Sequence, residues 1–297
     1  MADELRIDSH PTLERPVLIA AFRGWNDGGQ GASLAGAYLA RAWSAIEFAS
    51  IDPENFYDFQ ATRPMVSLVD GSIRQIEWPE NTFLYAPLPG GGRDAIIMLG
   101  VEPNLRWRTF CGHVTRVATD FNVELVVTLG SLLADVPHTR PAPVTGSATD
   151  PELIEQLGLQ ASRYEGPTGV VGALHDACNE AGISSASLWA AVPHYVSLTP
   201  SPRAAKALVD RLADLLGADV DTVELDEAAD AYALQVSEAV SADEETSAYV
   251  QDLERRVDEL ADEADIPSGD AIAAELTRYL RERDNDDEGD DDVARER

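Results

Sequence analysis

The chain has 297 residues, of which 44% are hydrophobic and 25% charged, the proportions of an ordinary globular protein. It carries 22 basic and 53 acidic residues, a formal net charge of −31, and about two thirds of that negative charge lies in residues 219–297. A field of this sign repels phosphate backbones and anionic membrane surfaces, which argues against sequence-independent nucleic-acid binding and membrane docking. The simpler explanation of the charge is a solvated, solubilising surface.

The cysteine content and the N-terminus favour the cytoplasm. Only Cys111 and Cys178 are present, without a CxxC spacing or a third ligand nearby, so neither a disulfide framework nor a metal site is expected. The first residues contain several acidic side chains and no apolar stretch long enough for a signal peptide, and no run approaches the length of a membrane span. We therefore expect a cytoplasmic protein without membrane insertion.

Residues 1–218 repeat a pattern of short apolar run, Gly- or Pro-marked loop and helical segment, which predicts an α/β core domain with a largely parallel sheet. Several runs are apolar on consecutive residues, as in strands that are buried on both faces. The expected strands are Val17–Phe22, Ile46–Ser50, Thr82–Ala86, Asp94–Leu99, Glu124–Leu129 and Ala186–Val192. The expected helices are Gly31–Trp43, Arg106–Phe121, Thr168–Ala181 and Pro202–Leu216, the last with Ser201 as N-cap and Gly217 at its end.

A hairpin is expected between the second and third of these strands. The runs Met65–Val69 and Ser72–Trp78 flank Asp70-Gly71, a dipeptide that accepts the positive φ values of a tight type I′ turn. The hairpin predicts that the sheet is mixed.

Beyond Gly217 the sequence becomes acidic and alanine-rich, which predicts a helical appendage over residues 219–283. Between Ser247 and Asp265, apolar residues spaced three and four apart form one narrow seam: Val250, Leu253, Val257, Leu260 and Ala264. Such a seam suits packing against a subunit or against the protein's own core. Ser268–Arg283 reads as a further helix, and residues 284–297 as a disordered acidic tail whose deletion leaves folding unchanged.

The segment from Arg23 to Gly31 lies between a predicted strand and helix, where backbone amides favour an anion. Gly24 and Gly29 have the spacing of a phosphate loop, but Gln30 stands where the lysine would be, so a tight turn that requires glycine is the alternative. Asn26 and Asp27 in this segment are placed at the carboxyl edge of the sheet, where open α/β proteins bind ligands.

Two similar segments, Ala134–His138 and Ala190–His194, each follow a predicted strand and end in Val-Pro-His. Parallel strands would bring His138 and His194 to one edge, in a concavity shared with Asn26 and Asp27. A histidine at such an edge can be an acid or base, a ligand-binding residue, or a hydrogen-bonded strand end.

Arginines supply the remaining candidates for binding. Arg63 precedes a proline, and Arg106 lies beside Trp107, so each could bind a carboxylate or phosphate, or pair with a local acid instead. The sequence contains no Gly-x-Ser-x-Gly elbow, HExxH or kinase signature. We therefore assign no catalytic residue, no metal ligand and no cofactor, and keep Asn26, Asp27, Arg63, Arg106, His138 and His194 as a candidate binding pocket.

Several segments together resemble the bacterial branch of the proteasome assembly chaperone 2 family. These are Gly24–Asp27, Asp52–Pro64, Glu102–Trp107, Leu132–Pro141, Tyr164–Gly169 and Pro193–Tyr195, and the resemblance spans roughly residues 15–283. It implies a three-layer α/β/α domain with a mostly parallel mixed sheet, similar to the purine nucleoside phosphorylase fold, and homo-oligomers. Proteasome-docking members carry a C-terminal hydrophobic-Tyr-x motif, whereas this chain ends Ala294-Arg295-Glu296-Arg297, so we do not expect direct insertion into a proteasome α-ring.

Two functions follow as hypotheses. The first is a chaperone-like or scaffolding interaction protein that binds protein partners and itself, with a homotrimer as the expected assembly. The second is a small-molecule binding protein or enzyme, phosphorylase- or hydrolase-like, that holds a small anionic ligand in the pocket at the sheet edge.

Overall fold

The computed structural model describes the whole chain except residues 1–3, 70–72, 91, 149, 162–164 and 266–297. The chain divides into two compact units, Met1–Ser247 and Ala248–Arg297. Among the described residues, no helix is long and apolar enough to cross a membrane.

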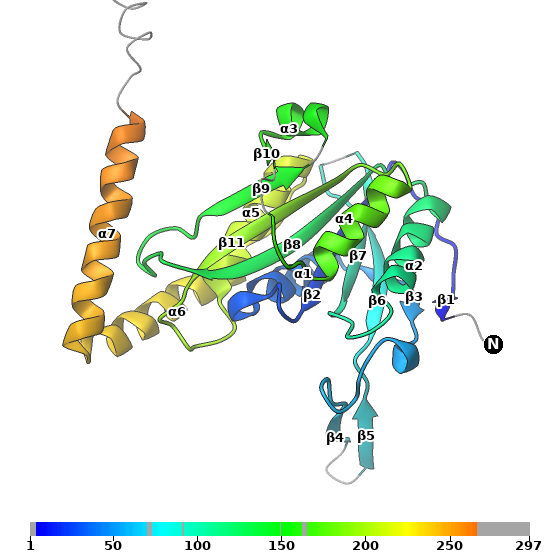
Figure 1. The fold of residues 1–297 in the computed structure, drawn as a ribbon, viewed down its shortest axis with the longest axis horizontal. Coiled ribbons are helices and arrows are strands. Elements are labelled where there is room, and N and C mark those ends of the chain that lie inside the picture. The colour runs from blue at the N-terminus through cyan, green and yellow to red at the C-terminus, as the bar shows by residue number, and fades with distance from the viewer. Residues whose placement is uncertain (1–3, 70–72, 91, 149, 162–164, 266–297) are drawn as a thin grey trace, which may run out of the picture. The chain divides into compact units, whose positions relative to one another are not determined.

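A nine-stranded mixed sheet forms the centre of the first unit (Figure 1). Its strand order is β1-β3-β6-β7-β2-β8-β11-β9-β10, and the four central strands β7, β2, β8 and β11 run parallel. The strands are β1 (Leu5–Ile7), β2 (Val17–Arg23), β3 (Ile46–Ile51), β6 (Asn81–Pro87), β7 (Asp94–Val101), β8 (Leu125–Ala134), β9 (Val144–Ala148), β10 (Gln160–Ala161) and β11 (Ser185–Pro193). The six predicted strands are all present, and the central ones are buried over most of their length.

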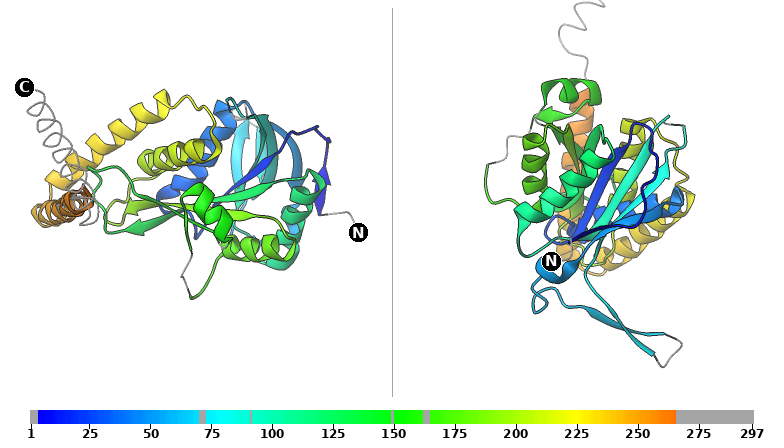
Figure 2. Two further views of the ribbon diagram at one scale, coloured as in Figure 1. Left: turned by 90° about the horizontal axis from the view of Figure 1, so that it is seen from above. Right: turned by 90° about the vertical axis from the view of Figure 1, so that its right-hand side faces the viewer.

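Helices cover both faces of this sheet, which gives the predicted three layers (Figure 2). One core joins the sheet to α1 (Gly31–Ala42) and α5 (Pro202–Leu216), with α6 (Val223–Ser241) packed beside α5. The other core joins the opposite face to α2 (Trp107–Asp120) and α4 (Val170–Glu180). A short helix, α3 (Pro151–Leu157), and two 3₁₀ turns, η1 (Gly28–Gln30) and η2 (Pro53–Asn55), complete the first unit.

The predicted hairpin is present, but it does not join the main sheet. Strands β4 (Met65–Val69) and β5 (Ile73–Glu77) pair only with each other, as a separate antiparallel sheet that projects from the body in both figures. The main sheet is mixed because β6 and β3 run antiparallel to their neighbours. The predicted turn at Asp70-Gly71 lies outside the described residues.

The acidic region after Gly217 is helical as far as the structure describes it. It contains α6 and α7 (Glu244–Asp265), and α7 carries the predicted seam. The packing of this seam against a subunit or against the protein's own core remains a prediction. The predicted helix Ser268–Arg283 and the tail 284–297 lie outside the described residues.

Candidate functional site

The carboxyl ends of β7, β2, β8 and β11 form one edge of the sheet, because these strands are neighbours and parallel. Asn26 and Asp27 follow β2, and His138 and His194 follow β8 and β11. The topology therefore brings these four residues to the same edge, as the sequence predicts.

The carboxylate of Asp27 is hydrogen-bonded to the first turn of α1. Its Oδ1 accepts hydrogen bonds from the backbone amides of Ala32 (2.9 Å) and Ser33 (3.1 Å), and Ser33 Oγ donates to Oδ2 at 2.5 Å. A carboxylate at a helix N-terminus satisfies free amides and opposes the positive end of the helix dipole. Asp27 is only 7% exposed, so its carboxylate holds the loop to the helix and is not free for a ligand.

Glu102 occupies the second helix N-terminus at this edge. Its Oε2 accepts from the backbone amide of Trp25 (2.9 Å), and its Oε1 accepts from the backbone amide of Val170, the first residue of α4, at 2.9 Å. The side-chain amide of Asn26 donates to the same Oε1 at 3.4 Å. Glu102 thus joins the loops that follow β2 and β7 to the start of α4.

Because of Glu102, the loop needs a glycine at position 24. Gly24 has φ +148°, and a Cβ atom there would lie 2.8 Å from the Cβ of Glu102. The glycine of this loop therefore serves a close packing contact, in agreement with the simpler of the two sequence interpretations. Sequence reasoning did not single out Glu102 as a site residue.

His138 and His194 meet through Tyr195. The Tyr195 hydroxyl accepts from the His138 backbone amide at 2.8 Å and lies 2.8 Å from His138 Nδ1, and the tyrosine ring packs edge-on against both imidazoles. His138 Nε2 lies 3.0 Å from Ser237 Oγ of α6. Both partners of the ring are hydroxyl groups, which can donate or accept, and they hold the His138 imidazole from both of its nitrogens.

The surroundings of the two histidines leave little room for a ligand. The cavity beside His138 measures about 10 Å³, which is about the minimum that a single water molecule requires. His194 is exposed, with Nδ1 3.2 Å from Asp135 Oδ1. The histidines are together in space, but the cavity beside His138 contains neither Asn26 nor Asp27.

The two candidate arginines, Arg63 and Arg106, do not join these histidines. Arg106 forms an ion pair with Glu4, and its guanidinium lies 5.5 Å from the centre of the Phe56 ring, in the core that contains α2. His113 Nε2 also lies 3.1 Å from Glu4 Oε2. Burial opposes ionisation of Glu4, but the hydrogen bonds from His113 and Arg106 outweigh it and lower its pKa. Arg63 is an exposed loop residue, so the structure does not unite the six candidates in one pocket.

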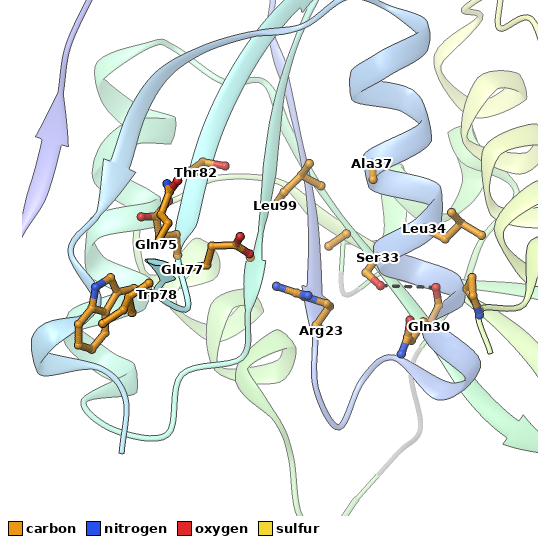
Figure 3. Close-up of a pocket in the computed structure, with 15 residues that line it drawn as sticks. Arg23, Gln30, Ser33, Leu34, Ala37, Gln75, Glu77, Trp78, Thr82 and Leu99 are labelled. Atoms are coloured by element: carbon orange, nitrogen blue, oxygen red, sulfur yellow. Dashed lines mark hydrogen bonds between the residues drawn. The ribbon is translucent and has the colours of Figure 1, made fainter. Parts of the chain in front are cut away.

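A cavity of about 640 Å³ lies between α1 and the base of the hairpin (Figure 3). Arg23 and Glu77 both contribute charged side chains to it, and Figure 3 shows the Arg23 guanidinium directed across the cavity towards the Glu77 side. A second cavity of about 440 Å³ adjoins Glu102 and also contains Arg23. None of the six candidate residues lines either cavity.

Among the described residues, the buried groups Cys111, Cys178 and His175 form neither an activated nucleophile nor a metal centre. Burial raises the pKa of Cys111 and of Cys178 to about 12, so both thiols stay protonated at neutral pH. Burial lowers the pKa of His175 to about 4; its ring nitrogens lie 3.0 Å from Thr128 Oγ1 and 2.9 Å from Ser185 Oγ. Within the described part of the chain, no three His, Cys, Asp or Glu side chains gather closely enough to hold a metal ion.

Comparison with known proteins gives a consistent result. The model of the PAC2 family matches residues 21–240. A PAC2 family protein from Streptomyces avermitilis is 46% identical, with a TM-score of 0.74 over 79% of this chain and 99% of that one. A proteasome-assembly chaperone homologue from Mycobacterium tuberculosis is also 46% identical, with a TM-score of 0.72 over the same shares of the two chains.

A more distant structure shares the fold. PbaB of Pyrococcus furiosus, an archaeal proteasome activator, is 20% identical and has a TM-score of 0.63 over 79% of this chain and 97% of its own. No curated protein matches the chain.

Proposed function

This chain belongs to the PAC2 family, and on that premise we propose that it is a chaperone-like or scaffolding protein that acts by binding other protein chains, copies of itself included. We place it in the cytoplasm and assign it no nucleic acid, no membrane partner and no cofactor. A homotrimer is the assembly that we propose.

One observation carries this proposal: large apolar side chains are exposed at the carboxyl edge of the sheet. Trp25 is 70% exposed, Leu133 57%, Leu105 48% and Leu132 43%, and all four lie on the loops or strand ends of that edge. Exposed apolar clusters of this kind mark protein contact surfaces, and tryptophan is enriched among the residues that dominate binding energy. We name these four residues the edge cluster.

The ligand-binding function receives less support at the same edge. Carboxylates of the protein itself, Asp27 and Glu102, already accept the backbone amides at the starts of α1 and α4. A phosphate that bound there would have to displace them against charge repulsion. This edge of the sheet is therefore better suited to binding a protein partner than to binding an anionic substrate.

The edge cluster can be tested by a pair of variants. Trp25→Ser with Leu133→Ser should abolish the co-purification of specific cytosolic proteins after cross-linking, because the anchoring side chains are removed. Leu234→Ser, at a 68% exposed residue of α6, is the matched control. Partners that are recovered equally with all three proteins would refute the assignment of binding to this edge.

A small-molecule function is the second candidate, and the cavity of about 640 Å³ with Arg23 favours it. A ligand that binds only the native state raises the melting temperature. Thermal shift with nucleosides, inorganic phosphate and acidic metabolites therefore separates the two functions. A saturable rise that Arg23→Ala removes would support the second candidate, and an unchanged melting temperature supports the first.

A further inference from the structure

The cavity of about 640 Å³ contains opposite charges that face each other without pairing. Arg23 is the last residue of β2, and Glu77 is the last residue of β5. Their side chains point into the cavity from opposite sides (Figure 3). Within the described part of the chain, neither side chain forms an ion pair or a hydrogen bond. A guanidinium and a carboxylate each form strong charge-assisted hydrogen bonds, so both remain available to a ligand.

The balance of charge around the cavity restricts the kind of ligand. Glu80 also lines it, so one cation stands against two carboxylates among the described lining residues. A phosphate would be repelled by Glu77 and Glu80, and a simple cation would be repelled by Arg23. A ligand with both a carboxylate and an ammonium group can contact both sides at once. The charges therefore favour a zwitterion.

The rest of the lining suits a short apolar peptide. Two side-chain amides, of Gln30 and Gln75, can each donate to and accept from a peptide bond. The volume of about 640 Å³ lies within the range of ligand pockets, about 300–1,000 Å³. The lining also includes apolar side chains from α1, β5, β7 and the residue after β5: Leu34, Ala37, Ile76, Leu99 and Trp78.

We propose that this cavity binds a short apolar peptide with free termini, its carboxylate on Arg23 and its ammonium group on Glu77 and Glu80. A free apolar amino acid carries the same two charges but has no peptide bond for Gln30 and Gln75. The proposal names the ligand class for the second candidate function, and it rests on that function.

Capped peptides test the two charges separately. Isothermal titration calorimetry of the whole chain should show binding of the dipeptide leucyl-leucine. Its N-acetyl form and its C-terminal amide each lack one charge, so each should bind about tenfold more weakly, the effect of one charge-assisted hydrogen bond. Glycyl-glycine keeps both charges but should also bind more weakly, because it buries less apolar surface. Free leucine that binds more tightly than leucyl-leucine would overturn the assignment to a peptide.

Matched variants assign each charge to its side chain. Arg23→Gln should weaken leucyl-leucine about tenfold but leave the C-terminal amide unaffected, because the amide has no carboxylate. Glu77→Gln with Glu80→Gln should weaken leucyl-leucine but leave the N-acetyl form unaffected. Arg74→Gln, at an exposed residue of β5 that does not line the cavity, is the control and should change neither. The melting temperature of each variant without ligand verifies that it is folded.

The other outcomes overturn the proposal. Equal binding of the free and the capped dipeptides would show that the two charges do not select the ligand. If nucleosides or inorganic phosphate bind through Arg23 and leucyl-leucine does not, the ligand class is wrong and the second candidate function stands. If none of these compounds binds at millimolar concentration, both fail, whereas binding of proteins through the edge cluster is judged by its own variants.

Discussion

At the scale of single residues, Glu102 fixes the architecture of the sheet edge. Its carboxylate accepts two backbone amides and one side-chain amide from two separate segments, the loop after β2 and the start of α4. Hydrogen bonds to a charged acceptor are about twice as strong as neutral ones. Glu102→Gln should therefore lower the free energy of unfolding by about 1–3 kcal/mol. Urea unfolding measures the change, with the exposed Glu47→Gln as control. An equal effect of the two substitutions would show that Glu102 does not hold these loops.

His175 should make stability depend on pH in a defined window. Burial lowers its pKa from 6.5 to about 4, so the unfolded chain binds its proton first as the pH falls. The stability that neutral His175 contributes is fully present above pH 6.5 and is lost as the pH falls towards 4. Between pH 7 and pH 5 the free energy of unfolding should therefore decrease by roughly 2 kcal/mol.

The comparison with His175→Gln isolates this contribution from the titration of the many carboxylates. Gln can bond to Thr128 and Ser185 but does not titrate. The difference in unfolding free energy between the two proteins should therefore change between pH 7 and pH 5. A difference that is independent of pH would contradict the buried neutral histidine.

The candidate residues differ in how far sequence could place them. His138 and His194 were predictable neighbours because each ends a Val-Pro-His segment that follows a buried strand, and neighbouring parallel strands share an edge. The surroundings of Arg106 could not be predicted, because its ion-pair partner Glu4 is 102 residues away in the sequence. Glu4 directly precedes β1, a three-residue strand with no sequence signal of its own. The hydrogen bonds by which Asp27 and Glu102 cap the starts of α1 and α4 depend on side-chain geometry, and the hydrophobic periodicity of the sequence does not predict them.

At the scale of elements, the hairpin should be separable from the rest of the first unit. Its strands pair only with each other, and its large side chains are exposed. Replacing Met65–Trp78 by a short Gly-Ser linker should change the free energy of unfolding of the remaining chain by less than about 1 kcal/mol, since few buried contacts are lost. Thermal unfolding followed by circular dichroism measures this, and a large loss of cooperativity would show that the hairpin supports the core.

Which elements could be predicted follows from their local signals. Helix α5 begins and ends at the predicted residues because Ser201, Pro202 and Gly217 mark both ends. The short elements β9, β10 and α3 were missed, since β9 contains glycine and serine and β10 has two residues. Their place in the fold is set by pairing with β11 and by packing of α3 on the sheet, not by local sequence.

At the scale of the whole molecule, the net charge of −31 opposes self-association, so the proposed assembly requires an apolar attraction between copies. Raising the ionic strength from 0.01 M to 0.15 M shortens the Debye length from about 30 Å to about 8 Å. The association constant, from sedimentation equilibrium at both salts, should therefore rise. A fall would indicate that ion pairs hold the copies together.

The most direct test of the central claim is the mass of the unaltered protein in solution. Light scattering coupled to size-exclusion chromatography at micromolar concentration should give the mass of three 32.1-kDa chains. The mass of two chains would contradict the proposed trimer but would still show that the protein self-associates. The mass of a single chain would contradict the account of this protein as a self-associating interaction protein.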